Sequence, residues 1–363
     1  MPHWSRRRHW SLRWNWMTWA TCGCCMHCPR YNRTAQQGVA LVVALLVFGL
    51  CAALMVAMQR EFTLFAQRGA NLFLQDQGYA YLRGAEELAA VALVMDYDAD
   101  QSRDDRSELW AQQATPYPLD EGGWLVGSLQ DLQGRFNLNA LAATPSEADE
   151  AAASDRFTAA EEFFIRLLQA LPDAPLGQAE AVAVTRAIGD WLDADGIPRA
   201  YGAEDDVYFR QSPPYRAANR PMASVSELRA VANVTPQLYL ALAPLVTVWP
   251  RTPAPLNIHT ASLPLLRAVN ADGDLAPLSE AQGEALLQTQ EEQGGFADVT
   301  AFLEHPVFGD KSMAKVLALL GESSSWFLLS AEVEVAERKM RLYSVLQRNK
   351  REVQPVVRAM GSL

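Results

Sequence analysis

Six acidic residues lie within one seventeen-residue stretch of the chain and could hold a divalent cation. They are Asp190, Asp193, Asp195, Glu204, Asp205 and Asp206. Calcium takes six to eight oxygen ligands in flexible geometry, and Gly196, Pro198 and Gly202 let the backbone fold back toward the acids. The spacing is not that of an EF-hand, because aligning Gly196 with the invariant glycine places Trp191 and Gly202 where acids are required. From spacing alone, a solvated acidic loop that caps the preceding helix is an equally good interpretation.

The rest of the sequence offers no recognisable catalytic chemistry. It contains no Gly-x-Ser-x-Gly, phosphate-loop or dinucleotide-binding motif, and nothing indicates a nucleophile, a base and an orienting group acting together. The stretch LNIHTASLPLLRAV at 256–269 resembles a helix-hairpin-helix unit, yet acidic residues surround it, which disfavours contact with nucleic-acid phosphates. We therefore expect neither an enzyme nor a nucleic-acid-binding protein.

An uncharged apolar stretch at residues 39–59 indicates where the chain is located. About twenty apolar residues are enough to cross a bilayer core as a helix. Six arginines precede this stretch, and the first charges after it are Arg60 and Glu61. By the positive-inside tendency the N-terminus stays in the cytoplasm, and roughly 300 residues lie across the membrane.

The residues before the apolar stretch indicate how the chain is processed. A conventional secretory signal places its cleavage site after the apolar segment, whereas here Gln36-Gln37-Gly38 followed by Val39 precedes it. This arrangement resembles the type IV prepilin signal, which a peptidase cuts after a glycine on the cytoplasmic side. Cleavage between Gly38 and Val39 would leave the apolar helix at the new N-terminus. An uncleaved single-span anchor is the alternative.

The chain after Gly38 is acidic and has no cysteine beyond the apolar stretch. Residues 1–38 hold six arginines and no acid, so the remainder carries 25 basic and 42 acidic side chains, a net charge of −17. Such a body is a poor partner for phosphate backbones and suits an exported domain, which its core, a metal or partners must stabilise without disulfides. The early cysteines match no common zinc spacing and lie in the segment expected to be removed; they are Cys22, Cys24, Cys25 and Cys28.

The hydrophobic pattern predicts an α+β fold. A long helix continues from the membrane to about Met95, and five aspartates between 96 and 105 form a polar loop after it. Strands follow at 123–129 and within 131–139, and helical segments with frequent prolines fill 139–321. Alternating residues over 326–335 predict a strand that pairs with 339–347 as a hairpin. We expect these last strands to rejoin the early ones in one sheet, so that the helical block is an insertion.

Five stretches, taken in order, resemble a known family. They are QQGVALVVALLV, DLQGRFNLNAL, DWLDADGIPRAYGAEDDVYF, PPYRAANRPMASVSELRAV and LNIHTASLPLLRAV. Together they look like general secretion pathway protein K, the minor pseudopilin K of type II secretion systems. The resemblance covers nearly all of the chain after Gly38. The middle motifs are specific, whereas all pilin-like proteins share the N-terminal junction.

The resemblance implies a fold, a location and partners. The fold is an N-terminal transmembrane and spine helix with a pilin-like antiparallel sheet domain and a large inserted all-α domain, SAM-like or helix-hairpin-helix-like. The location is the bacterial inner membrane, crossed once, with the C-terminal domain in the periplasm and at the tip of a short pseudopilus. The partners are the minor pseudopilins I and J and the prepilin peptidase, which cuts and N-methylates. Contact of the tip with secreted substrate stays open.

These expectations divide the chain into five parts. Residues 1–38 are the leader, 39–59 the transmembrane helix, and 60–138 the spine helix with the first strands. Residues 139–321 are the inserted helical domain, with two subdomains at about 139–250 and 251–321. Residues 322–363 are the closing strands of the pilin-like domain.

Val43, the fifth residue after the predicted cut, bears on the position of the subunit in a fibre. Most pilins and pseudopilins carry glutamate there, and a carboxylate within an apolar helix is costly unless it meets a cation. In pilin-like fibres that cation is thought to be the amino terminus of the subunit above. With valine the subunit has no charge to satisfy from above, while the Val39 amine can still receive the glutamate of the subunit below. The resemblance thus implies a tip subunit; the alternative is one more lipid-facing valine.

The resemblance also implies calcium in the helical domain. Within the acidic loop we take Asp193, Asp195, Glu204 and Asp206 as candidate ligands, with Asp190 and Asp205 next, for one or two ions. An ion would fix a loop that buries little apolar surface.

Two other functions stay open. The first is a tip minor pilin of a type IV pilus, acting in adhesion or DNA uptake, for which an exposed basic or disulfide-bonded tip would be expected and this sequence has neither. The second is a membrane-anchored calcium-dependent hydrolase, which turnover of esters, peptides or glycosides would reveal.

Overall fold

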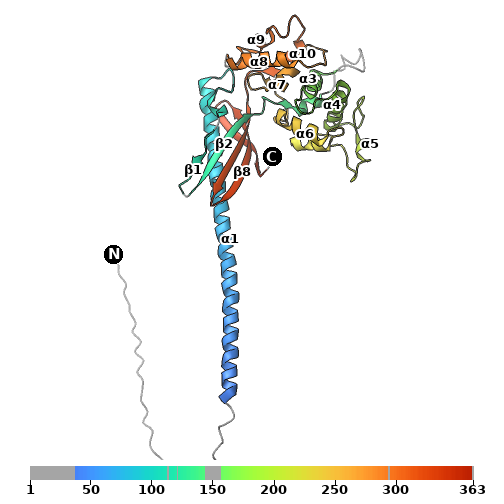
Figure 1. Cartoon of the computed structure of the whole chain (residues 1–363). Helices are drawn as coiled ribbons and strands as arrows, with labels where there is room; N and C mark the ends of the chain where they lie inside the picture. Colours follow the sequence, from blue (N-terminus) through green and yellow to red (C-terminus); the bar gives the residue numbers. More distant parts are fainter. Residues whose placement is uncertain (1–36, 113, 121, 144–156, 293–294, 362–363) are drawn as a thin grey trace, which may run out of the picture. The chain divides into compact units, whose positions relative to one another are not determined.

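The computed structural model describes residues 37–112, 114–120, 122–143, 157–292 and 295–361. The chain forms two compact units, residues 1–69 and 70–363. Most of the predicted leader, with its cysteines, lies outside the described residues. Helix α1 (Gln37–Ala99) contributes to both units and is blue to cyan in Figure 1.

The first unit consists, in its described part, of the N-terminal portion of α1. Every residue from 38 to 69 is exposed, and the most apolar 18-residue window of the helix has a mean hydropathy of 3.0. A helix that is apolar on all faces is stable in lipid or against other proteins rather than in water. This portion of α1 therefore fits a single membrane anchor.

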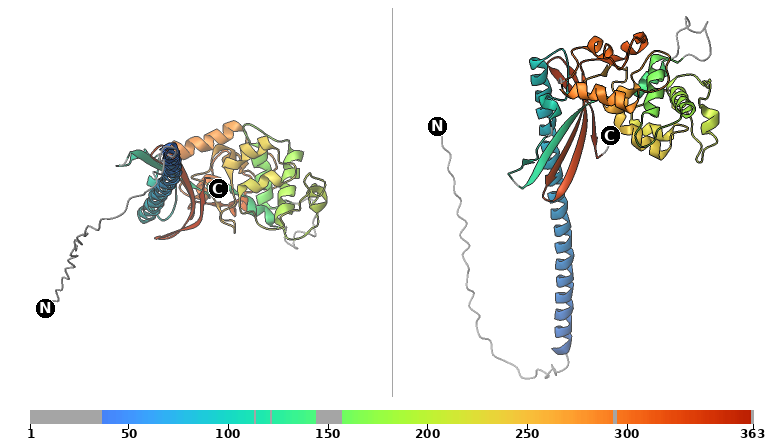
Figure 2. Two further views of the ribbon diagram at one scale, coloured as in Figure 1. Left: turned by 90° about the horizontal axis from the view of Figure 1, so that it is seen from below. Right: turned by 45° about the horizontal axis from the view of Figure 1, so that its top comes forward.

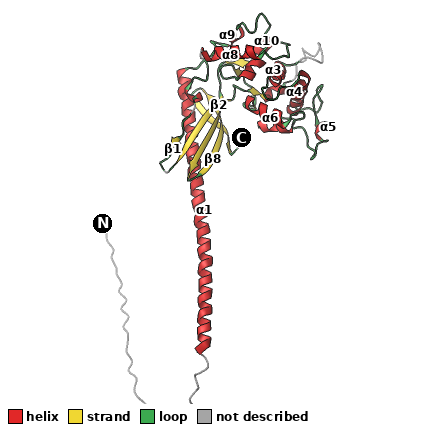
Figure 3. Cartoon of the chain, in the orientation of Figure 1, coloured by secondary structure: helices red, strands yellow, loops and turns green. Residues whose placement is uncertain are grey.

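In the second unit, the C-terminal portion of α1 packs on one face of a five-stranded sheet (Figure 3). Its buried hydrophobic residues are Leu82, Ala85, Ala89 and Leu93, at spacings of three and four that place them on one face of a helix. The sheet has the order β1-β2-β7-β8-β9 and is antiparallel throughout. The strands are β1 (Tyr117–Pro118), β2 (Gly123–Asp131), β7 (Trp326–Val335), β8 (Arg338–Asn349) and β9 (Glu352–Met360).

The register of β2 and β7 shows how the segments before and after the inserted region pair. They pair along their length from Gly123 opposite Val335 to Asp131 opposite Phe327. The predicted alternation is confirmed, since every second residue of β7 from Phe327 to Val335 is buried. The predicted hairpin of 326–335 with 339–347 is confirmed as β7 and β8, and the α+β fold with an inserted helical region stands.

The inserted region is mainly helical and is the green-to-orange part of Figure 1. Its helices are η2 (Leu138–Ala142), α3 (Ala159–Gln169), α4 (Gln178–Leu192), α5 (Asp205–Tyr208), η3 (Val225–Ala230), α6 (Pro236–Leu242), η4 (Ala243–Leu245), α7 (Leu263–Ala268), α8 (Glu280–Glu292), α9 (Val299–Leu303) and α10 (Ala314–Leu317). Helix α3 begins with a capping box, in which Thr158 and Glu161 satisfy each other's backbone N–H groups. Its apolar side chains, Phe163 and Phe164 among them, are fully buried in one continuous core.

The inserted region adjoins one end of the sheet (Figure 2). A cluster of polar side chains joins the two. Asp131, the last residue of β2, is buried and accepts hydrogen bonds from the Thr260 hydroxyl, the Ser324 hydroxyl at 2.7 Å and the Asn257 amide at 3.1 Å. Burial raises the pKa of this carboxyl, and the donors oppose that rise. The cluster fixes the place where the chain leaves the sheet and returns to it.

Three details differ from the sequence prediction. The strand expected within 131–139 is only β3 (Phe136–Asn137), which pairs in parallel with β4 (Val246–Thr247) outside the main sheet. A second short pair, β5 (Leu256–Asn257) with β6 (Leu320–Gly321), was not expected. Strand β9 was missed, because no residue in it is buried and because it contains Pro355, which argues against a strand.

The aspartate segment after α1 is also not the polar loop that was predicted. Asp96 lies in α1 and is buried, as are Asp104 and Asp105. Arg348 of β8 donates to Asp96 at 3.1 Å and to Asp104, and its guanidinium lies over the Phe327 ring. A remote arginine thus satisfies carboxylates that look solvated in the local sequence.

Candidate metal centre

The acidic loop directly follows helix α4, and Asp190 in the last turn of that helix fixes the loop backbone. The loop leaves α4 at Asp193, which has an extended backbone, and ends at α5. Asp190 is fully buried and accepts the Arg199 N–H at 3.2 Å. A Cβ on residue 202 would lie 1.9 Å from the Asp190 carboxylate, so the loop closes over this side chain only because Gly202 has none. Asp190 therefore stabilises the conformation of the loop.

Three of the predicted ligands come together. Carboxylate oxygens of Asp193, Asp195 and Glu204 all lie within 4.8 Å of one another. Glu204 is only 3% exposed, Asp193 is half-buried and Asp195 faces solvent. Both oxygens of Glu204 and Oδ1 of Asp193 are buried and accept no hydrogen bond from the described residues. Buried carboxylate oxygens without donors are costly, and a bound cation would satisfy them.

Asn219 is a fourth candidate ligand that the sequence reasoning missed. Its amide donates to the Asp195 carbonyl at 2.7 Å, while its Oδ1 is buried without a partner. Its backbone has a φ of +45°, a left-handed conformation that asparagine tolerates better than most residues. Amide oxygens are ordinary calcium ligands. The only available signal was its place in the PPYRAANRPMASVSELRAV motif, for which no role was assigned.

The acidic loop concentrates carboxylates in a desolvated environment. Burial, together with Asp190, Asp193 and Asp195, raises the pKa of Glu204 to about 7. Burial likewise raises the pKa of Asp190 to about 6 and that of Asp193 above its ordinary value. Crowded, desolvated carboxylates hold protons that a divalent cation displaces. The donor set, carboxylates with one amide oxygen, suits calcium.

Arg199 already neutralises part of this charge. Its guanidinium donates to Asp193 Oδ2 at 3.0 Å and to Glu161 Oε1 at 3.2 Å, and it lies 3.5 Å from Asp190. Asp193 is thus left with Oδ1 for an ion. Because Glu161 is also the capping residue of α3, Arg199 joins the loop to the core of the inserted region.

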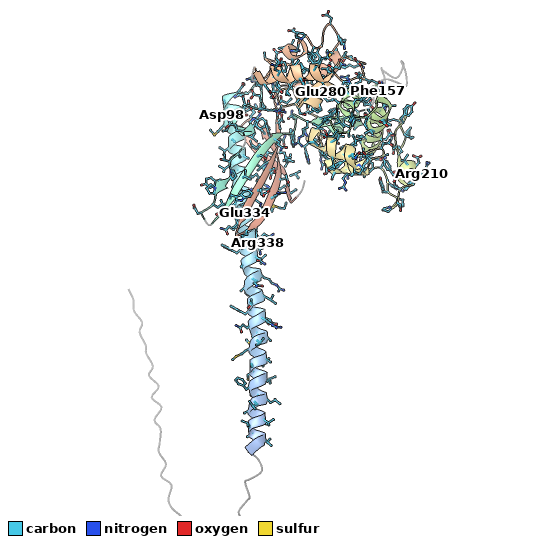
Figure 4. The ribbon with its side chains drawn as sticks, in the orientation of Figure 1. Asp98, Phe157, Arg210, Glu280, Glu334 and Arg338 are labelled. Carbon is cyan, nitrogen blue, oxygen red and sulfur yellow. The ribbon has the colours of Figure 1, made fainter. Side chains whose placement is uncertain are left out.

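The other predicted ligands point elsewhere. Asp206 is exposed and pairs with Arg210 at 3.5 Å; Arg210 is labelled in Figure 4. Asp205 accepts the Ala217 N–H at 3.0 Å. Neither shares the group formed by Asp193, Asp195 and Glu204.

A second acidic group in the described residues is Asp96, Asp104 and Glu108. Burial raises the pKa of Asp96 to about 6 and that of Glu108 to about 8. Here Arg348 binds two of the three acids, so a guanidinium takes the place that a cation would need. No oxygen of this group is among the buried unpartnered atoms of the described residues.

The predicted processing residues lie at the beginning of α1. Gly38, Val39 and Val43 fall in its first two turns, and all three are exposed. A Cβ on residue 38 would meet nothing within 4 Å.

Comparison with known proteins settles the family. The family model of type II secretion system protein K matches residues 134–251 and 256–320. Type II secretion system protein K of Pseudomonas aeruginosa is 32% identical over 341 residues, which cover 91% of this chain and 94% of that protein. The chain belongs to the type II secretion system protein K family. The Klebsiella pneumoniae member is also 32% identical, over 90% of this chain and 97% of its own.

A solved structure agrees with this membership. The crystal structure of the GspK-GspI-GspJ complex from enterotoxigenic Escherichia coli contains a chain that superposes with a TM-score of 0.67 at 26% identity. The match covers 82% of this chain and 100% of that chain. As a member of the protein K family, the chain is a minor pseudopilin, a structural rather than a catalytic component of type II secretion.

Proposed function

We propose that this minor pseudopilin occupies the tip of the pseudopilus and assembles there with the minor pseudopilins I and J. The observation that carries the proposal is the match to the whole of a chain in the solved GspK-GspI-GspJ complex. The absence of a carboxylate at Val43 supports the tip position. The protein would then initiate or cap the fibre for the export of folded proteins across the outer membrane.

The proposed location is the bacterial inner membrane, with the second unit in the periplasm. The prepilin peptidase cuts between Gly38 and Val39 and methylates the new terminus, which frees α1 to leave the bilayer. The exposed apolar surface of α1 between 39 and 59 then packs on neighbouring subunits. Burial of apolar surface at about 25 cal/mol per Å² gives substantial affinity even after the entropic costs of association.

The inserted region is proposed to bind calcium through the acidic loop. Glu204 with both oxygens, Asp193 through Oδ1, Asp195 and Asn219 would hold the ion. The cation supplies the positive charge that these buried oxygens lack. These residues orient the loop between α4 and α5, which contains no apolar cluster of its own to hold it.

The test of processing and assembly uses the full chain in its native membranes. The N-terminal mass is measured with and without the prepilin peptidase, and a C-terminally tagged chain is purified in detergent with I and J. We expect a methylated Val39 terminus only when the peptidase is present, and I and J in the purified material. An intact leader in both strains, or recovery of neither partner, would contradict the proposal.

The calcium site is tested by calorimetric titration of the metal-depleted protein with Ca²⁺. Glu204→Gln should abolish binding because it removes the negative charge and one oxygen of the most buried carboxylate among the proposed ligands. Asp206→Asn is the matched control, one charge removed from the same loop at an exposed site, and should bind like the wild type. Equal effects of both variants would mean that the loop is a generally acidic surface and not a specific calcium site.

A further inference from the structure

A polar cavity of about 280 Å³ lies where the sheet meets the inserted region. Its lining includes Arg106 from the segment after α1 and Arg135 from the segment after β2, with Ser262 at the start of α7. Trp110 and Leu129 also line it. These residues come from distant parts of the chain, so the cavity exists only in the folded protein.

Among the described residues, the two arginines in this cavity donate hydrogen bonds only to uncharged acceptors. Arg106 donates to the Thr260 carbonyl at 2.6 Å, and Arg135 donates to the Gln130 amide oxygen. Neither forms an ion pair with a carboxylate of the described residues, although the exported chain has a large excess of acids. Burial lowers the pKa of Arg135, and the nearby negative charge of Asp131 opposes that fall. Each guanidinium keeps further N–H groups free for a ligand.

The remaining polar groups also point to an anionic ligand. Asp131 lines the cavity, but its oxygens already accept the Gln133 N–H at 2.7 Å, two hydroxyls and an amide. The Ser262 hydroxyl is buried, caps nothing on α7 and has no partner. Two guanidiniums and one free hydroxyl match a carboxylate, which accepts forked hydrogen bonds from arginine.

An apolar cavity of about 250 Å³ adjoins the polar one and shares Trp110 and Leu129 with it. Its rim carries three large apolar side chains that solvent reaches: Leu88 of α1 is 68% exposed, Leu109 53% and Tyr117 68%. Exposed apolar residues gathered around a hollow are typical of binding surfaces. The two neighbouring cavities are together named the junction groove, which is apolar beside α1 and cationic at its other end.

We propose that the junction groove receives a segment of a neighbouring minor pseudopilin, with apolar side chains against Leu88, Leu109 and Tyr117 and a carboxylate between Arg106 and Arg135. This inference rests on the proposed assembly with I and J. A pseudopilin fits better than other occupants because the apolar end lies on α1, the helix through which the subunit is proposed to associate. The charge of the other end selects an acidic residue in that segment.

The test measures the affinity of the full-length chain in detergent for purified I and J. Arg106→Gln and Arg135→Gln should each weaken binding to one of these partners by about tenfold or more, because the partner's carboxylate then loses its cation. Arg229→Gln is the matched control: it is an exposed arginine of the inserted region, without an ion pair among the described residues, that lies over Tyr239. It should bind like the wild type.

A second measurement does not depend on the stability of the arginine variants. Leu109→Cys, labelled with a benzophenone maleimide, should photocross-link to a peptide of I or J that contains Asp or Glu. Labelled Leu240→Cys, 71% exposed on α6, should not. Unchanged affinities together with no cross-link from position 109, in a complex that still forms, would overturn the groove proposal alone. Failure of the wild-type complex to form would instead overturn the proposed assembly.

Discussion

Arg358, on the last strand of the sheet, holds Glu86 of α1 in a forked ion pair, with Nε 2.9 Å from Oε2 and Nη2 3.0 Å from Oε1. Ser344 of β8 also donates to this carboxylate at 2.6 Å, and Glu86 is only 2% exposed. One carboxylate therefore ties the spine helix to the last two strands of the sheet, β8 and β9. Such charge-assisted, forked contacts are among the stronger hydrogen bonds in proteins.

Replacement of this carboxylate should loosen the sheet from the helix. Glu86→Gln is expected to lower the free energy of unfolding by roughly 1–3 kcal/mol at pH 7, because donors of Arg358 and Ser344 lose a charged acceptor. Chemical denaturation of the full-length protein in detergent, followed by circular dichroism, measures this. The matched control is Glu87→Gln, whose side chain is 74% exposed; a similar loss there would contradict the assignment.

The same pair predicts a pH dependence. Burial raises the pKa of Glu86, but the hydrogen bonds from Arg358 and Ser344 and the nearby arginine charges outweigh it, so the pKa lies below its ordinary 4.5. A lowered pKa in the folded state contributes stability above pH 4.5, and this contribution is lost as the pH falls through the folded-state pKa. The stability difference between wild type and Glu86→Gln should thus shrink from pH 7 to about pH 3. A difference that is constant with pH would exclude the carboxylate as its source.

Arg199 should contribute more to the stability of the fold than its position in a loop indicates. It contacts Glu161, Asp190 and Asp193, and its side chain is 11% exposed. Arg199→Met leaves these buried acids without their shared cation and is expected to cost about 3–5 kcal/mol in metal-free protein. Thermal unfolding measures the loss. Arg210→Met, which breaks only the exposed pair with Asp206, should cost no more than about 1 kcal/mol; equal losses would refute a special role for Arg199.

Two glycines of the acidic loop give a steric test of how it is built. Gly202→Ala places a methyl group 1.9 Å from the Asp190 carboxylate, whereas a Cβ at Gly196 meets nothing within 4 Å. We expect Gly202→Ala to displace Asp190, lower the melting temperature and weaken Ca²⁺ binding. Gly196→Ala should change neither quantity. Wild-type calcium affinity in Gly202→Ala would show that closure over Asp190 is not needed for the site.

Val43 tests the tip position. Val43→Glu gives the subunit the acceptor that the terminal amine of a subunit above requires. Under the tip proposal, immunogold labelling of overproduced pseudopili should find this variant along the fibres, and Val43→Leu only at their ends. Labelling of both variants at the ends alone would mean that the missing carboxylate does not set the position.

The sequence was a good guide wherever regular spacing and short range decided the structure. The apolar stretch, the α1 face at Leu82 and Leu93, and the alternation of β7 all follow from helical or strand periodicity. The pairing of β7 with β2 was also predictable, because an amphipathic last hairpin needs a sheet to join. Strand β9 was not, because its partly exposed edge residues and Pro355 give a weak pattern.

The candidate site was predictable only in its composition. Acids in a glycine-rich loop indicated a cation, but distance along the chain could not separate Glu204, whose carboxylate turns inward, from Asp206, which turns out to Arg210. Asn219 and Arg199 could not be ranked from local sequence, because what makes them important is burial beside residues of other segments. The Asp96–Arg348 pair shows the same limit, since its partners are joined only by the closed sheet.

Because the chain returns to β2 only at its C-terminal end, the order in which its parts fold is constrained. Leu132 donates its N–H to the Trp326 carbonyl at 2.9 Å, so the two ends of the inserted region meet at one point. Contacts between segments so distant in sequence form slowly, after local ones. The inserted region can thus fold first, while the edge of β2 that later pairs with β7 is still unpaired. The C-terminal portion of α1 gains its full packing only when the last strands have joined the sheet, and a chain truncated before them would lack a complete sheet domain.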